Sequence, residues 1–420
     1  MILKKYKREH GAMAYWIMLT GFMMIALPLY PSNKILDYIK LFNTDVNIFH
    51  IAYVIILSLI ILRKKRIDKV YKVYFFVAGM VLVITMHSFY GIFIGHSRTY
   101  ILRDLNLFIL PLLVFISFSS LFRRIQFTLL DLLDYFFYGV LACSTINIIM
   151  YLTSNWSFWG LTTYAGNRFG GSYLSNIIFI FWYGILKNTY TNRKNNKFIT
   201  IYFIVVTVLS IILSQSRALL ILALIGTLII SFQAVFTKNH RVSFKNLFIA
   251  MMLIFVMSIG IYFILYGGSD IATRLSSTNI YSQDDSGMVR INIYEQNLKL
   301  FLEKPLGAGL GSLFPYYNGY GELLGYSNTI DNAFLTFAEK LGVFGIGFYL
   351  YFIVYNPIKY LLGMYKSTEN KIYLFTMTGF VTYLINTAFL TTQTITGIGV
   401  STLLWIFSAY TTVSKKTRRM

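Results

Sequence analysis

The chain has 420 residues, of which 56% are hydrophobic and only 13% are charged, and its formal net charge is +21. Soluble globular proteins carry about 25% charged residues, so this composition excludes a water-soluble domain and indicates a polytopic membrane protein. No nucleic-acid-binding motif accompanies the positive charge.

Apolar runs predict about twelve transmembrane helices, each near the ~20 residues that cross a bilayer. They lie at residues 12–30, 46–62, 73–94, 105–122, 133–152, 171–186, 198–213, 218–236, 247–266, 333–355, 372–390 and 397–413. The sixth, seventh and twelfth runs are short, which leaves the number open by about one or two. The predicted fold is therefore all-α, a single integral membrane domain over residues 1–420.

Lysine and arginine gather in every second connection, for example in residues 63–66 (RKKR) and in the tail at 415–419 (KKTRR). The positive-inside rule then predicts that both the N-terminus and the C-terminus are cytoplasmic. The net charge reports this topology and contact with anionic lipid. The only cysteine, Cys143, lies within the fifth predicted span, so the sequence predicts neither a disulfide framework nor a thiolate metal cluster.

One connection, residues 267–332, is much longer than the others and is predicted to be external. Long ordered connections in compact proteins are usually functional. Within it, residues 288–304 have the apolar spacing of an amphipathic helix that lies on the outer membrane face or caps the bundle. The expected apolar stripe consists of Ile291, Tyr294, Leu298 and Phe301. Pro305 and Gly307 end the helix.

Arg290 falls in the first turn of this predicted helix, where a cation opposes the helix dipole. We therefore expect a compensating anion, which could be Glu295, Asp284 or the phosphate of a ligand. The glycine-rich run at 307–311 follows the helix and could be a phosphate loop or a tight turn over the bundle. It has no preceding strand and lacks the lysine of a P-loop, which favours the tight turn.

A second arginine, Arg217, stands at the tip of a hairpin between the apolar runs 198–213 and 218–236. An arginine near hydrocarbon costs a few kcal/mol, so it is a functional hypothesis by default. The other arginines predicted near the outer face are Arg98, Arg103, Arg168 and Arg290. Guanidinium suits bidentate phosphate recognition, so the set indicates a site for a lipid-linked phosphate or diphosphate. The alternative is that each arginine anchors its own helix at the head groups.

Three ordered blocks resemble the O-antigen polymerase and O-antigen ligase superfamily of bacterial surface-polysaccharide assembly. They are residues 214–220 (SQSRALL), residues 290–311, which end in EKPLGAGLG, and residues 331–345, which contain DNAFL and EKLGVFG. A fainter match is RFGG at 168–171, followed by Asn176. The resemblance covers roughly residues 160–350 and rests on the order and spacing of the blocks, together with the long external connection.

The resemblance implies a membrane glycosyltransferase that uses no metal, no cofactor and no nucleotide sugar. The donor is a glycan on undecaprenyl diphosphate, and the acceptor is a sugar hydroxyl of another lipid-linked repeat unit. Arg217 and Arg290 would bind the diphosphate and stabilise the leaving group. Arg168 and Arg98 are weaker substrate-binding candidates. Asp331 would act as the base that orients or deprotonates the acceptor hydroxyl.

Asn332 is a further substrate-binding candidate, although an N-cap of the tenth span is the favoured interpretation. Ligases of the superfamily carry histidine where this chain has Asp331, which favours a polymerase. The alternatives are a ligase that transfers the glycan to lipid A core and, from another class, a flippase of lipid-linked oligosaccharide. The resemblance also implies a bacterial plasma (inner) membrane location, an O-antigen or capsular product, and a chain-length regulator protein as a partner.

Overall fold

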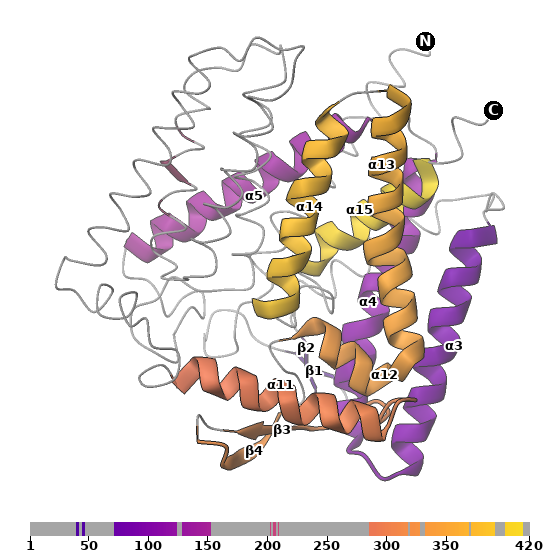
Figure 1. The fold of residues 1–420 in the computed structure, drawn as a ribbon, viewed down its shortest axis with the longest axis vertical. Coiled ribbons are helices and arrows are strands. Elements are labelled where there is room, and N and C mark those ends of the chain that lie inside the picture. Colours follow the sequence, from indigo (N-terminus) through magenta and orange to yellow (C-terminus); the bar gives the residue numbers. More distant parts are fainter. Residues whose placement is uncertain are drawn as a thin grey trace.

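The computed structural model describes residues 39–41, 44–46, 71–123, 128–152, 285–317, 320–327, 332–368, 371–390 and 400–414, with isolated helical positions at 202, 205, 206 and 209. The predicted spans at 12–30, 171–186, 218–236 and 247–266 lie outside these residues, as do nearly all of those at 46–62 and 198–213. The described part is mostly helical (Figure 1).

Five of the helices lie where the hydropathy pattern predicts spans. They are α3 (Tyr71–Phe93), α4 (Arg98–Phe122), α5 (Leu129–Leu152), α14 (Lys371–Leu390) and α15 (Val400–Ser414). The tenth predicted span is longer than expected, because α12 (Ala333–Tyr349) continues through a π-helical segment, η2 (Leu350–Tyr355), into α13 (Asn356–Thr368).

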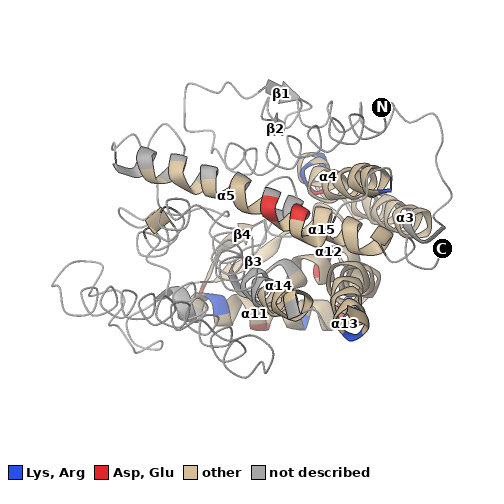
Figure 2. Cartoon of the chain, turned by 90° about the horizontal axis from the view of Figure 1, so that it is seen from above, with Lys and Arg blue, Asp and Glu red and all other residues tan. Residues whose placement is uncertain are grey.

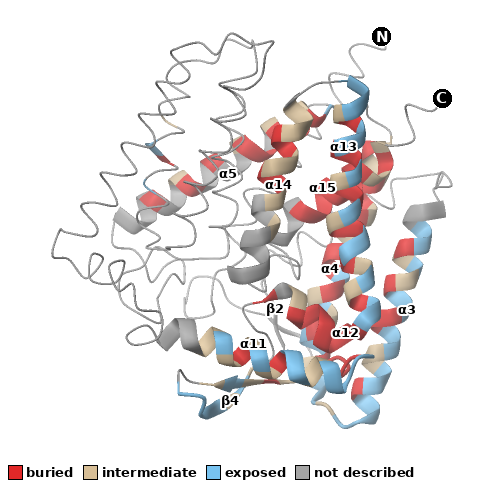
Figure 3. Ribbon diagram, in the orientation of Figure 1, coloured by how far each residue is buried: buried red, intermediate tan, exposed pale blue. Residues whose placement is uncertain are grey.

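Among the described residues, three segments are long and apolar enough to cross a membrane: Tyr74–Phe93, Arg98–Phe122 and Phe334–Thr368. Figure 2 shows how little charge the described helices carry along their lengths. Helix α3 exposes large apolar side chains, such as Phe75 and Phe89, and Figure 3 shows exposed positions along its length. In water such a surface would drive aggregation, whereas in a bilayer it is satisfied by lipid.

Aromatic side chains from four elements build the core of the bundle. Phe76 of α3 stacks on Phe352 of η2, with ring centroids 3.5 Å apart, and meets Phe115 of α4 edge-on at 5.1 Å. Trp405 of α15 closes the cluster at 6.3 Å from Phe76. The backbone carbonyl of Phe352 accepts a hydrogen bond of 2.8 Å from the Ser408 hydroxyl. Hence a carbonyl in the π-helical segment has a partner from a neighbouring helix.

Helix α11 (Asp285–Glu303) lies across one end of this bundle, below α12 and beside the lower end of α3 in the view of Figure 1. We call this end of the bundle, formed by α11, residues 307–312 and the first half of α12, the loop end. The helix begins before the predicted residue 288, since Asp285 and Ser286 suit a helix start. The prediction that Arg290 lies in the first turn is therefore wrong. It lies in the second turn, where a cation opposes the helix dipole less.

The predicted apolar stripe of α11 is wrong in part. Ile291 and Leu298 are exposed, and the buried positions are Ile293 and Asn297. The side-chain amide of Asn297 donates to the carbonyl of Ile293 over 2.6 Å. This bond within the helix lets a polar residue occupy the inner face, which an apolar-spacing rule does not anticipate.

The all-α prediction requires one amendment, because the described chain also contains two short antiparallel hairpins. One pairs β1 (Ile39–Leu41) with β2 (Thr44–Val46), whose last residue had been predicted to begin a span. The other pairs β3 (Phe314–Tyr317) with β4 (Leu323–Ser327) beside α11. Phe314 is fully buried and, with Ile293 of α11 and Leu335 of α12, forms a small apolar cluster beneath α11.

Candidate functional site

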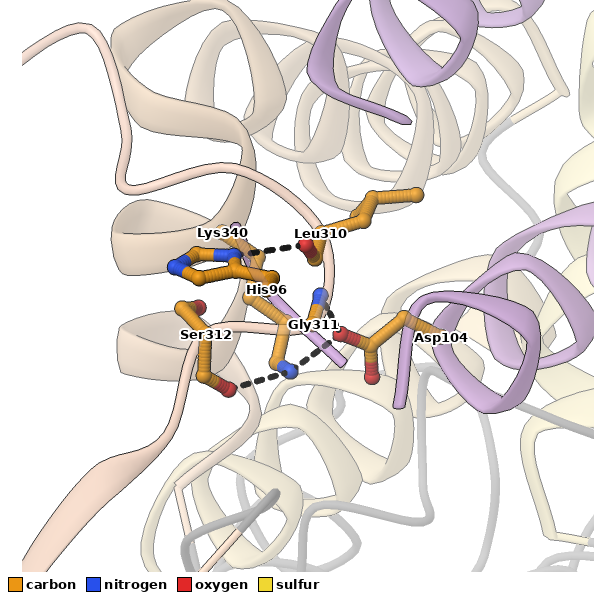
Figure 4. Close-up of polar contacts among 6 residues, drawn as sticks. All are labelled: His96, Asp104, Leu310, Gly311, Ser312 and Lys340. Atoms are coloured by element: carbon orange, nitrogen blue, oxygen red, sulfur yellow. Dashed lines mark hydrogen bonds and ion pairs between the residues drawn. The ribbon is translucent and has the colours of Figure 1, made fainter. Parts of the chain in front are cut away.

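The loop end gathers a turn and the first half of α12. Residues 307–312, which we call the glycine turn, connect α11 to β3 and are buried against α3, α4 and α12. The carbonyl of His87 in α3 accepts a hydrogen bond of 3.1 Å from the Leu310 amide. The Nδ1 atom of His96, between α3 and α4, lies 2.9 Å from the Leu310 carbonyl, to which it can donate (Figure 4).

The glycine turn has no room for a phosphate at its first glycine. Gly307 has a φ of 98°, and a Cβ built there would lie 2.7 Å from the Gly342 nitrogen and 3.0 Å from His87 Cε1. The missing side chain therefore permits close packing on α12 and α3. A tight turn over the bundle, which the sequence favoured, is what the structure has.

Helix α12 opens at Gly342, where φ is 61° and ψ is −157°. In an unbroken helix the Val343 amide would donate to the Glu339 carbonyl. Here Val343 donates to the carbonyl of Pro305 over 2.9 Å, and the Glu339 carbonyl accepts from the Ala308 amide over 2.6 Å. The two backbone groups released by the opening thus hold the segment that leaves α11.

A buried ion pair secures the other end of the glycine turn. The ammonium of Lys340 in α12 lies 2.5 Å from Oδ2 of Asp104 in α4, and both side chains have an exposed fraction of 0%. The same carboxylate oxygen accepts from the Gly311 amide over 2.7 Å. Lys340 also donates to the Ser312 carbonyl over 3.2 Å (Figure 4). Two charges and two backbone groups of the turn therefore satisfy one another away from water.

Glu339 is a third buried ionisable residue at the loop end. It is 2% exposed, and neither of its carboxyl oxygens has a hydrogen-bond partner within the described part of the chain. Nδ1 of His87 and Oγ of Ser312 are likewise buried there without a hydrogen bond. Polar atoms buried in this way are costly, which marks the loop end as a functional candidate.

Arg290 is half-buried on α11, one turn before Ile293. No residue in the described segments forms a hydrogen bond or ion pair with it. Glu295, one of the anions expected to compensate it, instead pairs with Lys299 at 2.9 Å on the exposed side of the helix. Asp284, another, lies outside the described residues. The guanidinium thus has no anionic partner among the residues that the structure describes.

Of the remaining predicted site residues, two are among the described residues and three are not. Arg98 is the first residue of α4 and is exposed. The Oδ1 atom of Asn332 accepts from the Leu335 amide over 3.0 Å, which confirms the predicted N-cap of α12 and engages that oxygen within the helix. Arg168, Arg217 and Asp331 lie outside the described residues, so their predicted roles stay predictions.

Sequence reasoning missed Asp104, Glu339 and Lys340. A signal was present, because Asp104 and Lys340 are charges of opposite sign within long, mainly apolar helical segments. An intramembrane charge calls for a named partner, and these two are each other's. The predicted fourth span begins at residue 105, which excludes Asp104. Among the described residues, no group of three or more histidine, cysteine, aspartate or glutamate side chains could hold a metal ion.

Comparison with known proteins identifies the region that contains this geometry. Residues 202–350 match the family model described as O-antigen ligase. The match includes α11, the glycine turn, both strands beside it and α12, but not Asp104. This part of the chain is therefore an O-antigen ligase family domain, and members of the family are membrane enzymes that transfer glycans. No curated protein matches the chain.

Proposed function

We propose that this protein, which contains an O-antigen ligase family domain, is a polymerase of lipid-linked oligosaccharide repeat units. It would transfer a growing glycan from undecaprenyl diphosphate to a sugar hydroxyl of another lipid-linked repeat unit. The observation that carries the proposal is Arg290: a half-buried guanidinium at the loop end, which has no anionic partner in the described segments. A diphosphate leaving group supplies the missing anion.

The chemistry is a single displacement. The acceptor hydroxyl oxygen attacks the anomeric carbon of the donor sugar, and the bond from that carbon to the diphosphate oxygen breaks with inversion. The electron pair leaves with undecaprenyl diphosphate, and the hydroxyl proton passes to Asp331. Arg290 and Arg217 would stabilise the charge that builds on the leaving group, as fixed cations in a water-poor site do effectively. The chain's own residues thus supply both the base and the electrophilic assistance.

The choice of polymerase over ligase rests on Asp331, since ligases of the superfamily carry histidine in its place. A carboxylate can still serve as the base if its basicity suits the hydroxyl. The buried charges in the described spans argue against a flippase. Asp104, Glu339 and Lys340 are packed inside protein at the loop end, whereas a flippase should line a central cavity with charge.

One experiment separates the proposals. Purified protein in liposomes is given the lipid-linked repeat unit alone, or that unit with lipid A core, and the products are resolved by length. A ladder of lipid-linked polymer from the repeat unit alone supports the polymerase. Products that appear only with lipid A core would indicate the ligase. Unchanged repeat units that cross the bilayer would indicate the flippase and overturn the proposed reaction.

A further inference from the structure

We propose that Asp104 and Lys340 are positioning residues for glycan transfer: their buried pair clamps the glycine turn and so fixes α11, with Arg290, relative to α12. The geometry is independent of the proposed function, but the consequence for turnover rests on it. Asp104 lies outside the family-matched segment, so α4 contributes this restraint from elsewhere in the chain.

A gain in folding stability does not by itself explain why this ion pair is buried. Removing two charges from water costs several kcal/mol per ion, and a buried ion pair is often no more stabilising than apolar residues of similar volume. Asp104 and Lys340 are both at 0% exposure, so each carries this full cost. Unlike apolar side chains, the pair forms directional contacts. It makes three hydrogen bonds, two of which join it to backbone atoms of the glycine turn.

A continuous path of contacts leads from the pair to Arg290. Lys340 holds the carbonyl of Ser312, and its ammonium lies 5.4 Å from the ring centroid of Phe314. Phe314 packs with Ile293 of α11. Arg290 precedes Ile293 by one helical turn, so it lies on the same side of α11. A shift of the glycine turn would therefore be transmitted to the guanidinium through two packed residues.

The same path reaches the start of α12. Leu335 belongs to the cluster of Ile293 and Phe314, and its amide is the one capped by Asn332. Asn332 directly follows Asp331 in the sequence. The clamp thus holds the proposed leaving-group cation and the N-terminus of α12 on a common cluster. Catalytic groups need placement within a fraction of an ångström, so loosening the clamp should reduce turnover before it reduces donor binding.

The test compares two double variants that differ in the hydrogen bonds they can make. Asp104→Asn with Lys340→Gln removes both charges, yet the two amides can reproduce the bonds to Gly311 and Ser312. Asp104→Leu with Lys340→Met fills a similar volume but holds neither backbone group. Chain growth from lipid-linked repeat units gives kcat and KM, and hydrogen exchange reports protection of the glycine turn and α11.

We expect the Asn/Gln protein to keep kcat within about threefold of the parent and the Leu/Met protein to lose about tenfold or more, with KM for the donor little changed. Exchange at the glycine turn should accelerate only in the Leu/Met protein. Ser408→Ala is the control for a lost buried hydrogen bond, because it acts on Phe352 remote from the turn; it should lower stability and leave kcat unchanged.

Equal kcat in the Leu/Met and parent proteins would show that the pair is only structural. Equal loss in both double variants would also overturn the inference, since the hydrogen bonds would not matter. If the Leu/Met protein does not accumulate, Asp104→Asn with Lys340→Met, which keeps only the Gly311 bond, replaces it with the same expectations. If the parent makes no polymer, the proposed function fails, and unchanged exchange protection in α11 would then separately overturn the clamp.

Discussion

The amide of Val343 donates its hydrogen bond to the carbonyl of Pro305, not to the carbonyl four residues earlier in its own helix. Gly342 causes this exchange, because its left-handed backbone turns the next amide outward. Non-helical backbone at membrane depth is tolerated only where protein satisfies it. The segment after α11 does so here, which couples the break in α12 to the position of α11.

Gly342→Ala should therefore be strongly destabilising. A Cβ at this position would lie 2.2 Å from the backbone carbon of Leu306, and φ of 61° with ψ of −157° strains any side chain. We expect a loss of about 3 kcal/mol or more, seen as a lower melting temperature of the detergent-solubilised protein. Gly347→Ala is the matched control, because a Cβ there meets nothing within 4 Å. Similar melting temperatures for the two variants would contradict the observed break.

Arg290→Lys and Arg217→Lys should each lose most polymerisation while protein levels persist. Lysine keeps the charge but lacks the planar fork that grips two phosphate oxygens, and we expect a fall of about tenfold or more in chain growth. Arg98→Lys, at the exposed start of α4, offers a comparison at a weaker substrate-binding candidate. Normal polymer lengths from both the 290 and 217 variants would reduce these arginines to membrane anchors.

Hydropathy located the described spans because a bilayer demands long apolar segments, and local chemistry located the Asn332 cap and the glycine turn. The Asp104–Lys340 pair was not predicted because its partners are 236 positions apart, and the sequence does not show which charges meet across the bundle. The break at Gly342 was not predicted for another reason. Glycine is common in transmembrane helices, so the sequence around it does not indicate a positive φ. Both features depend on tertiary contact.

Glu339→Gln should leave the protein as stable as the parent or more so. Both carboxyl oxygens are buried without a hydrogen bond among the described residues, so an amide of the same shape keeps the packing and removes the cost of burying a negative charge, a gain of up to about 1–2 kcal/mol. Glu295→Gln is the surface control, since its pair with Lys299 is more than half exposed and contributes about 0.5 kcal/mol. A markedly lower melting temperature for Glu339→Gln would reveal a partner for the carboxyl.

The predicted orientation can be tested with single cysteines after Cys143→Ser removes the native thiol. Lys299→Cys, on the exposed side of α11, should react with a membrane-impermeant thiol reagent in intact cells whose outer envelope admits it. Lys366→Cys, near the end of α13, should react only after the plasma membrane is permeabilised, because positive charge favours the cytoplasmic side. The reverse pattern would invert the topology and place the loop end in the cytoplasm.

The last prediction concerns Asp331, the proposed base. Asp331→Asn removes the proton acceptor but keeps the size of the side chain, so it should abolish chain growth. Donor binding should survive, because the arginines that recognise the diphosphate are unchanged. The measurement follows polymer length and donor binding separately, using purified protein and lipid-linked repeat units.

Asp331→His is the informative companion variant, since histidine occupies this place in ligases of the superfamily. We expect it to retain some chain growth, with a pH dependence that follows the imidazole rather than a carboxyl. Near-normal growth by the Asn variant would exclude Asp331 as the base. Attention would then pass to Glu322, which lies exposed before β4, and to direct attack by an unassisted hydroxyl. Glu322→Gln distinguishes these two, because only the first predicts that chain growth is lost.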